Sequence, residues 1–268
     1  MKQSAKKRIC AALLLSAALL LSACGSAVPN TVHSGDDLYG SRVGILSGSA
    51  MESYSEAGSF QSFTDRGTSF EAYGSGEELI RNLKAGTCDC VVTDSVLVKQ
   101  LKKENSGVRV MDDLFMSERY CIMLAKENVD LKKDINNAIT ALTEDGTIQQ
   151  IAEEYLLGTD YRYTPAATGG DGSGTLTLVV DGMFPPYSYR DENGQLTGID
   201  VDTAQAICDK LGVGLEITTE VRGNMVACIT DGTAEIAMDR FTANETDLKL
   251  VDFTDPYYTN EQAILVRK

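Results

Sequence analysis

The sequence has no tryptophan and a single histidine, His33, among its 268 residues. One imidazole cannot supply the ligand set of a metal cluster together with the base of a serine-type triad, so we expect neither a metal nor another cofactor. Basic residues are also scarce: 24 Lys and Arg stand against 39 Asp and Glu, which gives a formal net charge of −15. A chain this acidic repels nucleic-acid phosphates, and nucleic acid is therefore excluded as a partner.

Long apolar runs are almost absent, with one exception near the N-terminus, from Ile9 to about Leu21. The run is shorter than the ~20 apolar residues that span a bilayer, and four basic residues precede it. It ends in Leu21-Ser22-Ala23-Cys24, which resembles the lipobox of bacterial lipoproteins. The resemblance implies cleavage before Cys24 and a lipid on its thiol, which would hold the protein on the extracytoplasmic face of the cell membrane. The alternative is a transmembrane anchor with a chance cysteine.

The cysteines fit no disulfide framework. Five of the seven lie beyond the N-terminal segment, an odd number. The triplet Cys88-Asp89-Cys90 could indicate a metal site, but it lies in a β-like run in which residues i and i+2 share one face. Buried free thiols are the better interpretation. The five cysteines are Cys88, Cys90, Cys121, Cys208 and Cys228.

Strand-like and helix-like patterns alternate along the rest of the chain. We expect strands at 42–47, 69–73, 88–93, 119–125, 176–180, 215–219, 234–238 and 261–266, and a hairpin within 187–198. We expect helices after Gly48-Ser49 and at 76–85, 94–104, 131–143, 147–156, 200–211 and 223–230. This alternation predicts an α/β fold with largely parallel sheets, in which ligands bind at the carboxyl ends of strands.

Three motifs occur in order in the C-terminal part of the chain. They are Asp181-Gly182-Met183-Phe184-Pro185-Pro186-Tyr187, Gly198-Ile199-Asp200-Val201-Asp202 and Val251-Asp252-Phe253-Thr254-Asp255-Pro256-Tyr257-Tyr258. Together they resemble the first lobe of the family 3 extracellular solute-binding proteins, the polar amino-acid receptors of ABC importers. The resemblance implies a two-lobed periplasmic-binding-protein-like fold of type II, each lobe a mostly parallel sheet flanked by helices.

Segments that resemble the rest of the same family stand upstream of these motifs. Residues 37–45 with Gly48-Ser49 resemble the opening of the second lobe, 85–94 its binding strand, 118–122 the return crossover, and 145–147 with 153–155 the C-terminal helices. Because the two sets are complementary and no motif is duplicated, the chain reads as one circularly permuted protein, with a Gly-rich linker joining the usual ends. Two unrelated half-domains, or a fragment of a tandem receptor, are the alternatives.

The permuted order predicts eight segments. They are a lipoprotein signal peptide at 1–23, a tether at 24–36, the second lobe at 37–118, a crossover strand at 119–125, helices returning to the first lobe at 126–157, a Gly/Ser linker at 158–174, the first lobe at 175–258 and a second crossover strand at 259–268.

Several candidate ligand-binding residues follow from the resemblance. Phe184 occupies the position that stacks on the ligand, and Asp94 matches the acid that binds an ammonium group, although it could equally cap the helix that follows. Gly48 and Ser49 lie where a ligand carboxylate is usually bound. Asp181, Asp239 and Thr242 complete the set.

One family residue is missing, the arginine that clamps the ligand carboxylate. Its position falls on Asp247. Arg240 and Arg222 appear instead at positions that are usually uncharged, and a guanidinium can bind a carboxylate through two parallel hydrogen bonds. Arg240 is therefore a candidate replacement anchor with Arg222 in reserve, unless Arg240 pairs with Asp239 or Asp247 and contacts no ligand.

The resemblance implies a monomeric binding lipoprotein that captures a small polar, amino-acid-like ligand between its lobes and delivers it to an ABC transporter permease. It implies no catalytic residue. A ligand-sensing receptor is an alternative. Some relatives are cyclohexadienyl dehydratases, for which Asp94, Asp239 or Asp247 could supply a carboxylate, so an enzyme is a further alternative.

The lipobox predicts the fate of Cys24. Cys24→Ala should release the protein from membranes or leave the signal uncleaved, because the thiol that accepts the lipid is gone. Membrane fractionation and mass spectrometry of the mature N-terminus would measure this. A mature protein that begins elsewhere and carries no acyl mass would contradict the prediction.

Overall fold

The computed structural model describes residues 28–47, 49–166 and 174–268. Cys24, the predicted signal peptide, Gly48 and most of the glycine-rich part of the predicted linker lie outside the described residues. Within the described ranges, no helix combines the length and the apolar character that crossing a bilayer requires.

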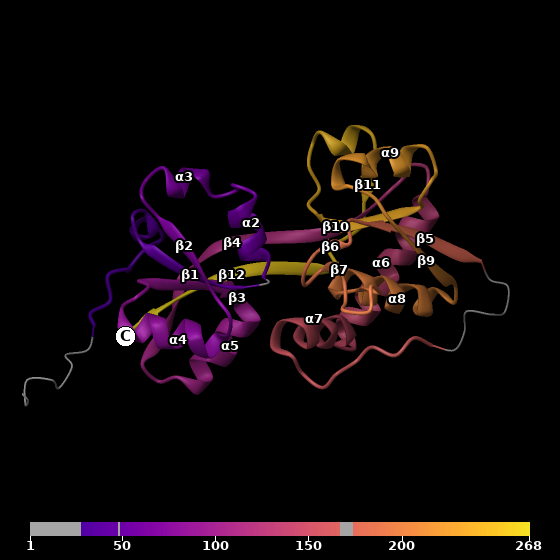
Figure 1. The fold of residues 1–268 in the computed structure, drawn as a ribbon. Coiled ribbons are helices and arrows are strands. Elements are labelled where there is room, and N and C mark those ends of the chain that lie inside the picture. Colours follow the sequence, from indigo (N-terminus) through magenta and orange to yellow (C-terminus); the bar gives the residue numbers. More distant parts are fainter. Residues whose placement is uncertain (1–27, 48, 167–173) are drawn as a thin grey trace, which may run out of the picture.

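The described chain folds into two α/β lobes that two long strands connect (Figure 1). Lobe A comprises η2 (Gly35–Leu38), β1 (Arg42–Leu46), α2 (Ala50–Glu56), α3 (Gln61–Thr64), β2 (Ser69–Tyr73), α4 (Gly76–Ala85), β3 (Cys90–Asp94) and α5 (Ser95–Glu104). Lobe B comprises α6 (Val129–Glu144), α7 (Thr147–Leu157), β5 (Thr175–Val180), β6 (Met183–Phe184), β7 (Ser188–Arg190), β8 (Leu196–Thr197), α8 (Ile199–Leu211), β9 (Gly214–Thr219), η3 (Arg222–Asn224), α9 (Met225–Thr230), β10 (Ile236–Phe241), η4 (Asp247–Lys249) and β11 (Asp252–Phe253).

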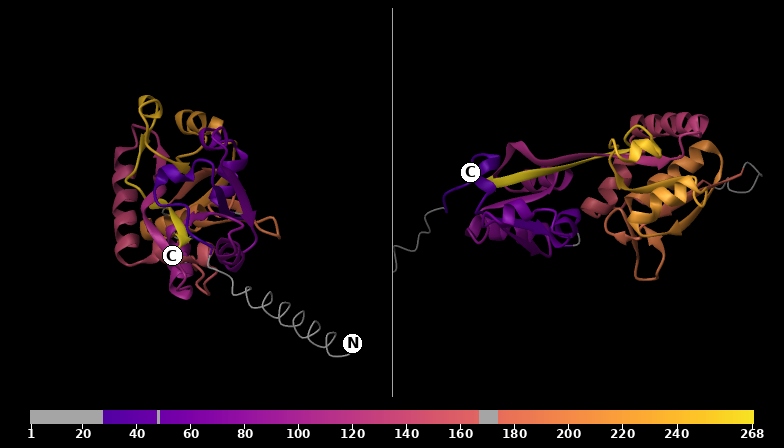
Figure 2. Two further views of the ribbon diagram at one scale, coloured as in Figure 1. Left: turned by 90° about the vertical axis from the view of Figure 1, so that its left-hand side faces the viewer. Right: turned by 90° about the horizontal axis from the view of Figure 1, so that it is seen from above.

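The connecting strands are β4 (Val108–Leu124) and β12 (Tyr258–Arg267), which pair antiparallel along most of their length. Figure 2 shows them bridging the two lobes side by side. Through them the lobes share one sheet with the order β2-β1-β3-β12-β4-β10-β5-β9. In lobe A the strands β2, β1 and β3 are parallel, and in lobe B so are β10, β5 and β9. The two-lobed α/β fold is confirmed, and the antiparallel crossing strands make its sheet mixed.

The strand β4 begins at Val108, well before the predicted start at residue 119. Its first half carries exposed charged residues, including Asp112 and Asp113, and lacks the apolar run by which buried strands are recognised. This half of β4 is a strand because it pairs with the apolar strand β12, and its own side chains do not predict that.

Two predicted loops are packed rather than extended into solvent. In the predicted tether, Val32 is fully buried in the apolar cluster of Leu38, Val43 and Val266. In the predicted linker, Tyr161 and Tyr163 pack against the core of lobe B, and the Tyr163 hydroxyl donates to Asp209 at 2.7 Å. The neighbouring residues are polar, so the composition of these segments predicted flexible loops and did not reveal the apolar residues that anchor them.

The cysteines behave as free thiols. Cys88, Cys90, Cys121 and Cys208 are buried, and Cys228 is partly exposed. Cys88 and Cys90 do not share a face as predicted: they belong to different apolar clusters on the two sides of the sheet of lobe A. The reason is that β3 begins only at Cys90, so the alternation of a strand does not apply at Cys88.

A buried carboxylate at the start of α8 makes stability depend on pH. Asp200 is inaccessible to solvent, and burial raises its pKa to about 7 from an ordinary value of 3.8. The Tyr257 hydroxyl donates to Oδ1 at 2.6 Å, while Oδ2 has no partner among the described residues. The folded protein therefore holds a proton that the unfolded chain releases between these two pH values.

We predict that stability falls as pH rises from about 4 to about 7, by up to about 4 kcal/mol from this group, because the raised pKa stabilises only the protonated form. Asp200→Asn should flatten that fall, whereas Asp112→Asn, at an exposed position on β4, should leave it unchanged. Urea unfolding across this pH range would measure both. An equal pH slope in wild type and Asp200→Asn would contradict the prediction.

Candidate functional site

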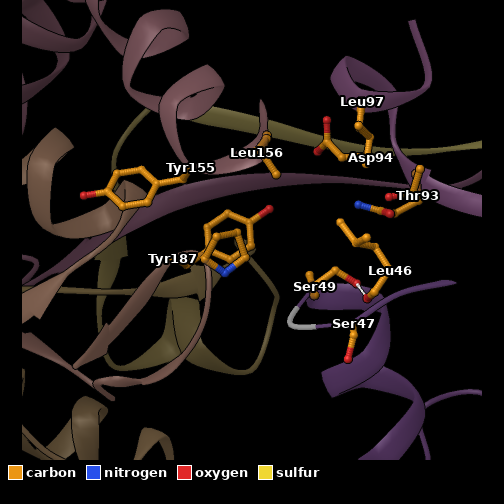
Figure 3. Close-up of a pocket in the computed structure, with 12 residues that line it drawn as sticks. Leu46, Ser47, Ser49, Thr93, Asp94, Leu97, Tyr155, Leu156 and Tyr187 are labelled. Carbon is orange, nitrogen blue, oxygen red and sulfur yellow. Dashed lines mark hydrogen bonds between the residues drawn. The ribbon is translucent and has the colours of Figure 1, made fainter. Parts of the chain in front are cut away.

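The two lobes face each other across a cavity of about 150 Å³ beside the crossing strands (Figure 3). Lobe A contributes Leu46, Ser47, Ser49, Ala50, Thr93, Asp94 and Leu97 to its lining. Lobe B contributes Tyr155, Leu156, Pro186 and Tyr187, and β12 contributes Gln262. The strand ends of β1 and β3 thus open onto this cavity, as expected for a ligand site in an α/β sheet.

Asp94 brings a buried carboxylate to the wall of lobe A. Its Oδ1 accepts from the backbone N–H of Val96 at 2.8 Å, which caps α5, and its Oδ2 accepts from the Tyr258 hydroxyl at 3.1 Å. The residue is only 5% exposed, and burial raises its pKa to about 6 although both hydrogen bonds oppose the shift. Capping is therefore established, and the carboxylate also faces the cavity.

Tyr187 forms the opposite wall, from lobe B. Figure 3 shows its hydroxyl directed into the cavity, on the side of Asp94. Its ring packs edge-on against Tyr120 of β4, with 5.3 Å between centroids, and against Tyr258 of β12 at 6.1 Å. The crossing strands thus hold this wall in place through aromatic contacts.

Of the predicted site residues Ser49 and Gly48, the structure describes only Ser49. The Ser49 hydroxyl donates to the Leu46 carbonyl at 2.5 Å, at the turn between β1 and α2, and Ser49 lines the cavity. Gly48 lies outside the described residues.

Phe184 does not line this cavity but lies next to it, 6.4 Å from the Tyr187 ring. The Arg240 guanidinium covers the Phe184 ring, with 3.1 Å from its Cζ to the ring centroid. The Tyr54 ring of lobe A also approaches Phe184, with 5.8 Å between the ring centroids. The Tyr54–Phe184 contact therefore joins the two lobes beside the cavity.

Asp239 is fully buried, and the two candidate arginines neutralise it. Arg240 Nη2 lies 2.8 Å from its Oδ1, and Arg222 Nη1 lies 2.8 Å from its Oδ2. Burial works against the charge on Arg240, but Asp239 outweighs it and keeps the pKa of Arg240 raised. Asp181 lies nearby, and burial together with the Asp239 charge raises its pKa. These four residues form a compensated charge cluster.

The structure does not bring the remaining candidates to the cavity. Thr242 lines a separate open groove with Glu118 and Arg119. Asp247 is partly exposed at the start of η4, where it accepts from the Asn244 side chain at 2.7 Å. The predicted set is thus divided among the cavity, the charge cluster and the surface.

Sequence reasoning missed several cavity residues, chiefly Tyr187, Thr93 and Gln262. Tyr187 stands in the same Phe-Pro-Pro-Tyr motif as Phe184, so the motif contained the signal but did not reveal which aromatic residue faces the cavity. Gln262 is opposite Asp94 in the β3–β12 ladder, a pairing that no local pattern reveals.

Two lobes joined by two crossing strands, with a cavity between them, define the periplasmic binding protein fold of type II. A phosphate-binding protein of a phosphate ABC transporter from Streptococcus pneumoniae TIGR4 shares this fold, with a TM-score of 0.50 and 12% identity over 85% of this chain and 88% of that one. Residues 176–268 match bacterial extracellular solute-binding proteins, family 3. The chain is thus related to this family through about its last third.

The chain is also similar to two curated relatives of different kinds. The chain is 30% identical over 95 residues to the L-cystine-binding protein TcyJ of Escherichia coli (strain K12), covering 35% of this chain and 36% of that protein. It is 33% identical over 85 residues to the cyclohexadienyl dehydratase of Pseudomonas aeruginosa, covering 32% of each. The chain therefore matches about a third of the length of these relatives, one a binding protein and one an enzyme.

The two roles of Asp94 can be separated by substitution. We predict that Asp94→Ala lowers the free energy of unfolding by about 1–2 kcal/mol, because the cap of α5 and the acceptor for Tyr258 are both lost. Asp94→Asn keeps a carbonyl acceptor for Val96 and should cost less than half as much. Chemical denaturation at pH 4 measures both, because the folded protein then holds Asp94 protonated and the cost of its buried charge is small. Equal losses would show that the cap is not what Asp94 contributes.

Proposed function

We propose that this protein is an extracytoplasmic substrate-binding protein of an ABC importer, which captures a small amino acid or related compound between its lobes. The observation that carries the proposal is the cavity between the lobes, to which Asp94 and Tyr187 contribute from opposite sides. A permease would then recognise the closed, liganded form, and no covalent chemistry is required.

Asp94 is the proposed partner of the ligand's ammonium group. A buried carboxylate with few competing donors gains most from a cation, because closure removes water that would screen the pair. Since the pKa of Asp94 is about 6, an amine ligand should bind more weakly below that pH, where the carboxylate is protonated. Ser49, Thr93 and Tyr187 would supply hydroxyl groups to the ligand's remaining polar atoms.

The sequence allowed two roles for Arg240: it could bind a ligand anion, or it could pair with Asp239. Both Nε and Nη2 bond to Asp239 Oδ1, at 3.3 and 2.8 Å. These contacts favour the second role, which would leave the ligand carboxylate to the hydroxyl groups around the cavity.

The proposal includes attachment to the membrane through a lipid on Cys24 and a monomeric state. It also includes the circularly permuted order. A contact between segments far apart in the sequence supports that order: Arg267 of β12 donates from Nε to the Pro29 carbonyl at 3.2 Å. In a permuted chain, the segments on either side of the new break remain neighbours on one lobe.

A cyclohexadienyl-dehydratase-like enzyme is the second candidate, favoured by the relative of that activity. A ligand-sensing receptor is a third possibility on the same scaffold. Incubation with prephenate separates the first two, since an enzyme would consume it and a binding protein would return it unchanged. An adjacent permease gene would favour transport over sensing.

We predict that a thermal-shift screen against amino acids, dicarboxylates, polyamines and short peptides yields at least one amino-acid-like compound that raises the melting temperature. Asp94→Asn should then weaken its binding by about 2–5 kcal/mol in calorimetry. Asp112→Asn, a carboxylate exposed on β4, serves as the control and should bind like wild type. Unchanged affinity in Asp94→Asn would remove Asp94 from the site.

A further inference from the structure

Arg240 is buried in the contact between the lobes rather than extended into solvent. Its side chain is 8% exposed. The guanidinium lies over the Phe184 ring of lobe B, and the centroid of the Tyr54 ring of lobe A is 6.0 Å from its Cζ. The Tyr54 hydroxyl is itself fixed, because it bonds to Glu118 at 2.8 Å and to the Tyr120 hydroxyl at 2.9 Å. Two aromatic rings, one from each lobe, therefore border one guanidinium.

Asp239 completes the surroundings of this guanidinium. Its carboxylate accepts from Nε and Nη2 of Arg240 on Oδ1, and Asp239 is inaccessible to solvent. An aromatic face combined with a buried carboxylate is the chemical environment that binds guanidinium and ammonium groups. We call Phe184, Tyr54 and Asp239 the aromatic box.

The backbone is shaped to deliver Arg240 to this box. The β10–β4 ladder pairs Ala237 with Met123 and then Phe241 with Cys121, so extra residues of β10 bulge out of the ladder. Arg240 lies in that bulge at φ +55°, and no other non-glycine residue in the described ranges has a positive φ. Bulges redirect side chains, and a strained residue persists only when its surroundings hold it.

We infer that Arg240 is an internal occupant of the aromatic box, which fills with the protein's own guanidinium the place that could otherwise take a cationic side chain of a ligand. Resting on the proposed function, this restricts the ligand class to amino acids and related compounds with an uncharged side chain. An external cation could enter only by separating Arg240 from Asp239, which would leave the buried guanidinium of Arg240 without its carboxylate partner.

The charges around the box agree with this restriction. Arg240 and Arg222 both pair with Asp239, so this carboxylate has no uncompensated charge left to attract a second cation. The carboxylate of Asp94, across the cavity, remains available for the ammonium group that all α-amino acids share.

Chemical rescue tests the inference without knowledge of the natural ligand. Arg240→Ala deletes the equivalent of ethylguanidinium, so that ion is the matched probe. We expect millimolar ethylguanidinium to raise the melting temperature of Arg240→Ala and to bind it at least tenfold more tightly than wild type, as measured by calorimetry. The double variant Arg240→Ala with Phe184→Ala should lose this response.

Arg66→Ala is the matched control, because Arg66 lies over the Tyr39 ring at 4.3 Å on the exposed surface. It should show no rescue. If Arg240→Ala is not recovered folded, Arg240→Gln keeps more of the side chain and should gain affinity for arginine and lysine over wild type in the amino-acid screen.

The outcomes separate this inference from the proposed function. Rescue of Arg240→Ala with no amino acid bound by wild type would support the box and refute the transport receptor. Wild type that binds arginine or lysine as tightly as neutral amino acids would overturn the internal occupant while leaving the receptor intact. Equal responses of wild type and Arg240→Ala to ethylguanidinium would also overturn it, as would selective loss of an acidic ligand in Arg240→Ala.

Discussion

The antiparallel pairing of β4 with β12 is the constraint on which the rest of the structure depends. The two strands run through both lobes, and in their ladder Tyr120 of β4 is directly opposite Tyr258 of β12. These tyrosines pack against Tyr187 from lobe B, and Tyr258 also bonds to Asp94 from lobe A. Residues in both walls of the cavity therefore contact the same pair of strands. A bend in those strands would move the walls relative to each other.

Two buried carboxylates, Asp94 and Asp239, set the chemical character of the cleft, and they differ in the groups that bond to them. Asp239 is compensated by two arginines, whereas Asp94 has only neutral donors and keeps a raised pKa. A carboxylate held by neutral donors in a buried wall can still gain from a cation, while a doubly paired one cannot. This difference separates the part of the cleft that can accept a ligand charge from the part whose charges are already satisfied.

Much of the architecture was predictable from the sequence because local patterns of capping and apolar residues determine it. Helices such as α4 combine a capping serine, an apolar face and a C-terminal glycine, and the structure shows Ser75 accepting from Glu78 and Gly86 in the left-handed region. The two-lobed class followed from motif order. The first half of β4 did not, because its charged residues become a strand only through pairing with the distant β12.

The site was predictable residue by residue only where a motif fixed both position and direction. Asp94 stands at the end of a buried strand, so its place at the cavity could be inferred. Phe184 and Tyr187 share a motif, and nothing in the motif reveals that Tyr187 lines the cavity while Arg240, from the bulge of β10, covers Phe184. Asp247 matched a family position in sequence and nevertheless lies at the surface, because a single-position alignment carries no information about local displacement of the chain.

The central claim is that one ligand site lies between the lobes and is shared by both. A crystal structure of the protein with the compound that its ligand screen identifies tests this most directly. The account predicts ligand density in the cavity bounded by Asp94 and Tyr187, with the Arg240 guanidinium still on Phe184 and Asp239. Density confined to the outer face of one lobe, with the cavity between the lobes empty, would contradict it.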